Sequence, residues 1–105
     1  MEKCNQYETQ FISFLFSLHE RPGCYIAYPS LEKLLNFMVG YEVAVYNLTG
    51  YQIVLEQEFR RYLCKKYKKD ELNCSLFQLF RQDVTDEEAF ENFFVELRNF
   101  CEKTK

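Results

Sequence analysis

The chain has 105 residues, of which 48 % are hydrophobic and 18 % aromatic, and its formal net charge is −3. This length allows one domain with one core, and the apolar content excludes an intrinsically disordered chain. The slight negative charge argues against a nucleic-acid binder that depends on overall positive charge, and it suits a partner with a basic surface. Glycine (3) and proline (2) are scarce, which favours helices over a β-domain with many tight turns.

Residues 5–20 are expected to form the first helix, because apolar side chains recur there at helical spacing. The stripe consists of Tyr7, Phe11, Phe14, Leu15 and Leu18. The sequence Arg21-Pro22-Gly23 then ends this helix, since proline cannot continue it and glycine allows the backbone to turn.

Residues 24–29 are bounded by glycine and proline, and we expect a short extended connector. Its apolar side chains are expected to pack on the core; they are Tyr25, Ile26 and Tyr28. A longer helix is predicted over residues 30–49, with Ser30 as its N-cap and Gly50 at its end. Apolar residues occupy more than one face of this helix, so we expect it to be the most buried. Gly40 inside it suggests that another helix crosses closely there.

Three further helices are predicted over residues 51–69, 73–82 and 85 to the end. The last has the clearest signal, because Thr85 and Glu88 have the spacing of a capping box and a regular apolar stripe follows them. The chain is therefore predicted to be all-α, a compact bundle of about five helices, four long and one short, in a single domain over residues 1–105.

We expect a cytoplasmic protein, since the N-terminal residues lack the pattern of a secretory signal and no stretch suits a membrane span. The number of cysteines is odd and none are closely paired, so they are interpreted as reduced thiols that act as small hydrophobic side chains. They are Cys4, Cys24, Cys64, Cys74 and Cys101.

No catalytic residue, metal site or cofactor is predicted. His19 is the one histidine, and its place at the end of the first helix suits an interaction with the helix dipole. A cysteine nucleophile would depend on this same histidine as its base, and a zinc site would need scattered ligands. We therefore expect a binding protein rather than an enzyme.

The run from Arg60 to Lys69 holds six basic residues in ten. It is typical of the solvated face of an amphipathic helix, and the alternative is a module that binds RNA or a nucleoprotein. In that alternative the contacts would be Arg60, Arg61, Lys65 and Lys68. Another alternative is a homo-oligomeric scaffold that buries the surplus aromatic side chains between subunits.

Several short motifs in the chain occur together. Residues 21–26 fit the pattern Arg-Pro-Gly-x-Tyr-Ile, followed by Ser-Leu at 30–31, Gly-Tyr at 40–41, Asp-Glu-Glu-Ala at 86–89 and Phe-Phe at 93–94. With these motifs the whole chain resembles a set of small all-helical bacterial proteins. Some members of that set resemble immunity proteins of toxin–immunity systems, including those of contact-dependent growth inhibition.

The resemblance implies a protein that binds a cognate toxin domain in a 1:1 complex and neutralises it, the toxin often being a nuclease that cleaves tRNA. A toxin-bound host factor is an alternative contact, and neither membrane nor nucleic acid is expected as a partner. An acidic patch can mimic nucleic acid in a basic toxin cleft, and exposed aromatic side chains can anchor the complex. The expected partner contacts are Asp83, Asp86, Glu87, Glu91, Tyr25 and Tyr28.

Overall fold

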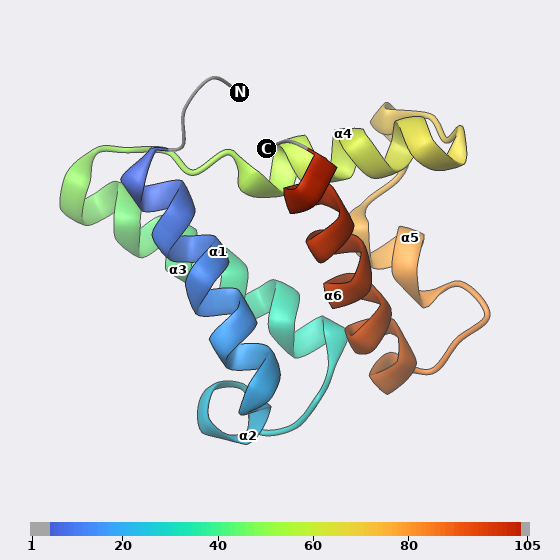
Figure 1. The fold of residues 1–105 in the computed structure, drawn as a ribbon, viewed down its shortest axis with the longest axis horizontal. Helices are drawn as coiled ribbons and strands as arrows, with labels where there is room; N and C mark the ends of the chain where they lie inside the picture. The colour runs from blue at the N-terminus through green and yellow to red at the C-terminus, as the bar shows by residue number, and fades with distance from the viewer. Residues whose placement is uncertain (1–4, 104–105) are drawn as a thin grey trace.

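The computed structural model describes residues 5–103, which form six α-helices and one 3-10 turn with no strand among them (Figure 1). In chain order these elements are α1 (Gln6–Glu20), α2 (Pro22–Tyr25), α3 (Leu31–Thr49), α4 (Leu55–Tyr67), the 3-10 turn η1 (Glu71–Asn73), α5 (Leu76–Arg81) and α6 (Asp86–Lys103). The predicted all-α bundle is confirmed, since α1, α3, α4 and α6 are long and α5 is short. One helical turn, α2, was not predicted.

Helix α6 is the centre of the core. It contacts α3, α4 and α5, and in Figure 1 it stands between the α1–α3 pair and α5. Its buried residues are Ala89, Phe90, Phe93, Phe94, Leu97 and Phe100. Phe93 packs edge-on against Phe59 of α4, with ring centroids 5.3 Å apart, and its centroid lies 5.5 Å from that of Phe80 in α5. Phenylalanine rings from three helices therefore form much of the interior.

Helix α3 is less buried than predicted. It buries Leu31, Leu34 and Met38, all in its first half, where α3 packs against α6. Aromatic stacking joins it to α1, because the rings of Phe11 and Tyr41 lie 4.5 Å apart. Apolar side chains in the second half remain exposed, so the expectation that this helix is the most buried was wrong. The exposed ones are Val39, Val43, Tyr46 and Leu48.

The predicted extended connector is wrong in its first part, because residues 22–25 form the helical turn α2. Pro22 occupies the first position of this turn, where its fixed φ favours a helix and its missing N–H costs no hydrogen bond. Ile26 is buried as expected, but Tyr25 and Tyr28 are 42 % and 55 % exposed. The edge of the Tyr25 ring contacts Phe14, with centroids 5.0 Å apart, and the rest of the ring is open to solvent.

Local signals placed several helix ends correctly. The Ser30 hydroxyl accepts a hydrogen bond from the Lys33 N–H at 3.2 Å, as expected of an N-cap. Thr85 and Glu88 form the predicted capping box, with N···O distances of 2.9 and 3.1 Å. Gly50 ends α3 in the left-handed conformation, at a φ of 80°.

Helix α4 begins at Leu55, four residues later than predicted, because the buried carboxylate of Glu8 holds the preceding segment out of the helix. One oxygen of Glu8 accepts hydrogen bonds from the Tyr51 hydroxyl and from the Val54 N–H, each at 2.7 Å. These contacts join the start of α1 to the start of α4. Nothing in the sequence around Glu8 indicated this role.

Three smaller expectations concern Gly40, the cysteines and membrane-spanning helices. A Cβ atom added to Gly40 would meet nothing within 4 Å, so the predicted close helix crossing is wrong. Cys64 is buried as a small hydrophobic side chain, whereas Cys24 is exposed, and Cys4 lies outside the described residues. Among residues 5–103, no helix has the combination of length and apolar character that a membrane crossing requires.

Candidate partner-binding surface

Of the predicted acidic contacts, Asp86 has a structural task. It is the first residue of α6, yet one of its carboxylate oxygens accepts hydrogen bonds from the N–H groups of Leu31 and Glu32, at 3.1 and 3.3 Å. These are free N–H groups in the first turn of α3, where a negative charge also favours the helix dipole. Asp86 therefore caps a second helix and joins α6 to α3, which gives this residue a structural role.

Glu91 lies five residues further along α6, and its side chain is 56 % exposed. Its Oε1 lies 2.8 Å from Nε2 of His19, whose ring stacks on Phe94 with centroids 4.3 Å apart. An ionised carboxylate can accept but cannot donate, so Nε2 carries the proton in this hydrogen bond. His19 lies in the last turn of α1, as expected, and its contact with Glu91 also joins α1 to α6.

These contacts bring the predicted partner residues to one end of the molecule. The end of α1, the loop between α2 and α3 and the start of α6 meet there, at the bottom of Figure 1. Glu87 is exposed, and no ion pair or hydrogen bond within residues 5–103 involves its side chain. Tyr28 extends the surface, with the Lys33 ammonium 5.2 Å from the centre of its ring. We call the segment from Thr85 to Asn92, at the start of α6, the acidic shoulder.

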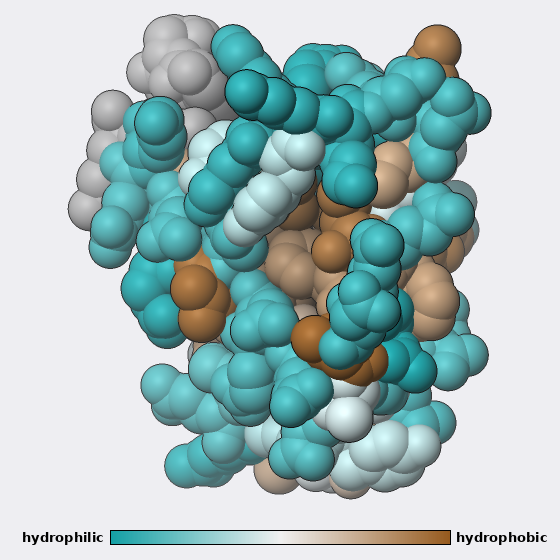
Figure 2. Space-filling model, turned by 90° about the vertical axis from the view of Figure 1, so that its right-hand side faces the viewer, coloured by the Kyte–Doolittle hydropathy of each residue, from teal (hydrophilic) through white to brown (hydrophobic). Residues whose placement is uncertain are grey.

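A groove of about 850 Å³ adjoins the acidic shoulder and was not predicted. It lies between the end of α4, the segment from η1 to α5, and the outer side of α6. Figure 2 shows it as a hollow with apolar surface at its base and hydrophilic side chains around it. Asn92 lines both the groove and the shoulder, and Asp83 lines the groove from the loop before α6.

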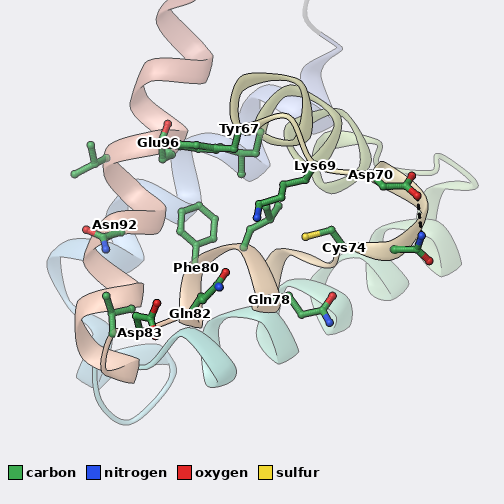
Figure 3. A pocket seen from close by; sticks show the side chains of 15 residues that line it. Tyr67, Lys69, Asp70, Cys74, Gln78, Phe80, Gln82, Asp83, Asn92 and Glu96 are labelled. Carbon is green, nitrogen blue, oxygen red and sulfur yellow. Dashed lines mark hydrogen bonds between the residues drawn. The ribbon is translucent and has the colours of Figure 1, made fainter.

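Apolar side chains and a ring of polar ones give the groove its chemistry. The apolar ones include Leu63, Leu79, Phe80, Val84 and Val95, and the polar ones include Lys69, Asn73, Gln78, Gln82, Asp83 and Asn92. In Figure 3 the Phe80 ring points into the groove and the Lys69 chain reaches over it from the end of α4. Such a mixture of an apolar base and amide groups suits a peptide segment better than a small apolar ligand. The sequence signal that could have indicated this groove is Val95, an apolar residue outside the buried stripe of α6.

The upper edge of the groove is fixed by Glu96. Its two carboxylate oxygens accept hydrogen bonds from the Tyr67 hydroxyl and, at 2.9 Å, from the Lys66 ammonium. Burial acts to raise the pKa of Glu96, but the hydrogen bonds from Tyr67 and Lys66 outweigh it and hold that pKa below its usual value. The hydrogen bonds to Glu96 raise the pKa of the Tyr67 hydroxyl and that of the Lys66 ammonium, so all three groups keep their charge states near neutral pH.

The basic run on α4 is partly neutralised by nearby carboxylates and carbonyls. Arg60 donates to the backbone oxygen of Glu71 at 2.8 Å, and Arg61 pairs with the Glu71 carboxylate at 3.1 Å. Lys65 and Lys68 are exposed and have no ion pair within residues 5–103. Of the four predicted basic-patch contacts, the structure thus leaves two without an ion-pair partner.

Metal chemistry has no support in the described residues, since no three His, Cys, Asp or Glu side chains between positions 5 and 103 are grouped as a metal ion requires. The groove and the acidic shoulder together can bind a partner molecule through apolar contact, amide hydrogen bonds and negative charge. No protein-family model, curated protein or solved structure matches the chain.

Proposed function

We propose that this chain is an immunity protein, which binds a cognate toxin domain in a 1:1 complex in the cytoplasm and neutralises it by protein–protein contact. The observation that carries the proposal is the groove with the acidic shoulder beside it. Exposed carboxylates next to an apolar recess combine charge complementarity with an anchoring site, as stable protein interfaces do. The sequence resemblance to immunity proteins of toxin–immunity systems points to the same function.

A nuclease toxin is the partner that this surface fits best. The cleft of an enzyme that cleaves tRNA must be basic, because it binds phosphates. Asp83 and Glu87 carry carboxylates with no ion pair among the described residues, and Glu91 adds a third, paired with His19 at 2.8 Å. These side chains would occupy positions that phosphates take in the substrate, while a toxin loop would enter the groove.

The test is a charge reversal of the acidic shoulder and of Asp83, which lines the adjoining groove. The triple variant Asp83→Lys, Glu87→Lys, Glu91→Lys should bind the cognate toxin domain more than tenfold more weakly, measured by isothermal titration calorimetry. Asp86 is left unchanged because it caps α3. The matched control is Glu102→Lys, an exposed acid on the same helix about 22 Å from Glu87, given a rise of 1.5 Å per residue.

Two results would count against the proposal. If the triple variant binds the toxin domain as tightly as the wild type, the acidic shoulder is not the contact surface. If co-expression of the wild-type chain gives cells no protection from that toxin domain, the immunity function itself is wrong.

RNA binding through α4 is the weaker candidate. Lys65 lies with Lys66, Lys103 and Tyr62 around a second, shallower groove of about 730 Å³, which could hold a phosphate and a stacked base. Yet Lys66 is already paired with Glu96, which reduces the charge offered to a phosphate. If this candidate is right, a gel-shift assay at low salt should show RNA binding that falls steeply as salt is added, and Lys65→Glu should abolish it.

A further inference from the structure

The outward side of α3 exposes apolar surface that no element between residues 5 and 103 covers. Val39, Val43 and Tyr46 are 59 %, 53 % and 56 % exposed, and their spacing of four and three residues places them on one face of the helix. Glu42 lies on the same face. A groove of about 310 Å³ begins there, and its lining residues are Glu42, Val43, Tyr46, Gln52 and Ile53.

Glu42 is unsatisfied in this groove. Its Oε2 atom is shielded from solvent and has no hydrogen-bond partner within the described residues. Burial, together with the nearby carboxylates of Glu56 and Glu8, raises the pKa of Glu42 to about 7. A carboxylate with a buried oxygen that has no donor is poorly stabilised in its ionised form, so a partner's donor that reaches the part of Glu42 lining the groove would be favoured.

The charges around Glu42 favour a cation as that donor. Glu8 receives its two hydrogen bonds from neutral groups, the Tyr51 hydroxyl and the Val54 N–H. Among residues 5–103, the one cation paired with these carboxylates is Arg60, which lies 3.7 Å from Glu56. Within that part of the chain, Glu8, Glu42 and Glu56 share one positive charge, and the excess is negative.

We propose that this face of α3 is a docking site for a partner protein that inserts an arginine or lysine side chain between apolar ones. Val43 and Tyr46 would cover the aliphatic stem of that side chain, and Glu42 would accept hydrogen bonds from its charged end. A second copy of this chain fits poorly, because a two-fold contact through this face would place one Glu42 group against another. The site lies apart from the acidic shoulder, so this inference does not depend on the proposed function.

Binding at this site should depend on pH, because a cation favours the ionised form of Glu42. The titratable and charged groups that face it are Glu8 from α1, Tyr51 from the segment before α4, and Glu56 and Arg60 from α4. Burial and the hydrogen bond to Glu8 raise the pKa of Tyr51 to about 12, so Glu42 is the group that changes charge near neutrality. Its ionised fraction falls about thirtyfold between pH 8 and pH 5.5, and affinity should fall by more than tenfold.

The experiment is selection of random 12-residue peptides displayed on phage against the wild-type chain at pH 8. Enriched peptides should carry an arginine or lysine flanked by apolar residues. By fluorescence polarisation, they should bind Glu42→Gln and Val43→Asp more than tenfold more weakly, and Glu102→Gln as tightly as the wild type. Both test positions are partly or largely exposed, so the variants should fold, and circular dichroism checks this.

Several outcomes would overturn the proposal. They are a selection with no enriched peptide, enriched peptides without a cation, and peptides whose affinity is the same for Val43→Asp. Sedimentation velocity at 100 µM provides a further test, since a dimer that Val43→Asp dissociates would identify a second copy as the occupant. Loss of toxin binding in the shoulder variant would leave this result unchanged, so the two proposals can fail separately.

Discussion

Replacing Glu8 with alanine should destabilise the fold more than any other single change at a charged residue in α1. The side chain is 6 % exposed, and one of its oxygens accepts the hydrogen bonds from Tyr51 and Val54, each at 2.7 Å. Its removal leaves the Val54 N–H without an acceptor at the point where the chain enters α4. The segment 51–54 then loses the contacts that hold it against α1.

The expected loss in the free energy of unfolding follows from these two hydrogen bonds. A hydrogen bond to a charged group contributes about 1.5–3 kcal/mol, and the partial exposure of Tyr51 places this pair at the lower end, so the total loss is about 3 kcal/mol. Relief of the repulsion between Glu8 and Glu42 would oppose this by less than about 1 kcal/mol. With a urea m-value of about 1.5 kcal/mol/M, the unfolding midpoint should fall by about 1.5–2 M.

Urea unfolding followed by circular dichroism measures this loss, with Glu20→Ala as the control because Glu20 is an exposed acid on the same helix. The control should change stability by less than about 0.5 kcal/mol. A double-mutant cycle of Glu8→Ala with Tyr51→Phe should give a coupling energy of about 1 kcal/mol. Strictly additive effects, or a Glu8→Ala variant as stable as the control, would refute the reasoning.

Two further predictions concern Asp86 and Glu42. Asp86→Ala should lower the free energy of unfolding by about 1–2 kcal/mol through loss of the α3 cap, and Asp86→Asn should lower it by less. Urea unfolding measures both effects, and equal stability of the wild type and the two variants would contradict the capping role. The raised pKa of Glu42 means that the folded state holds a proton that unfolding releases, so this group stabilises the fold fully below about pH 4.5 and loses its effect as pH rises through about 7. Allowing for its partial exposure, about 1–2 kcal/mol should disappear between pH 4.5 and pH 8, and Glu42→Gln should remove this part of the pH dependence. Parallel pH profiles for the two proteins would show that Glu42 is not the group responsible.

The candidate surface was predicted in part. Glu87 and Glu91 are exposed as expected and lie at the end of the molecule that also carries Tyr25 and Tyr28. Asp86 was assigned to a partner, but its hydrogen bonds to residues 31 and 32 give it a structural role. No pattern near position 86 indicates this, because the two N–H groups are 54 and 55 residues away in the chain.

What the sequence determined by itself is the existence of α1, α3, α4, α5 and α6 and several of their ends. Ser30, Gly50 and the Thr85–Glu88 pair act on backbone groups within four residues, so their effect can be read locally. The apolar stripe of α6 likewise predicted the buried face of that helix.

Only the tertiary structure decided which apolar faces are covered and which polar groups meet. The second half of α3 is as apolar in sequence as the first, yet Val43, Tyr46 and Leu48 stay exposed there. The groove needs residues from α4, α5 and α6, and the His19–Glu91 hydrogen bond joins positions 72 residues apart. Helical periodicity tells which side of a helix is apolar, but the partner for that side depends on how helices distant in sequence pack together.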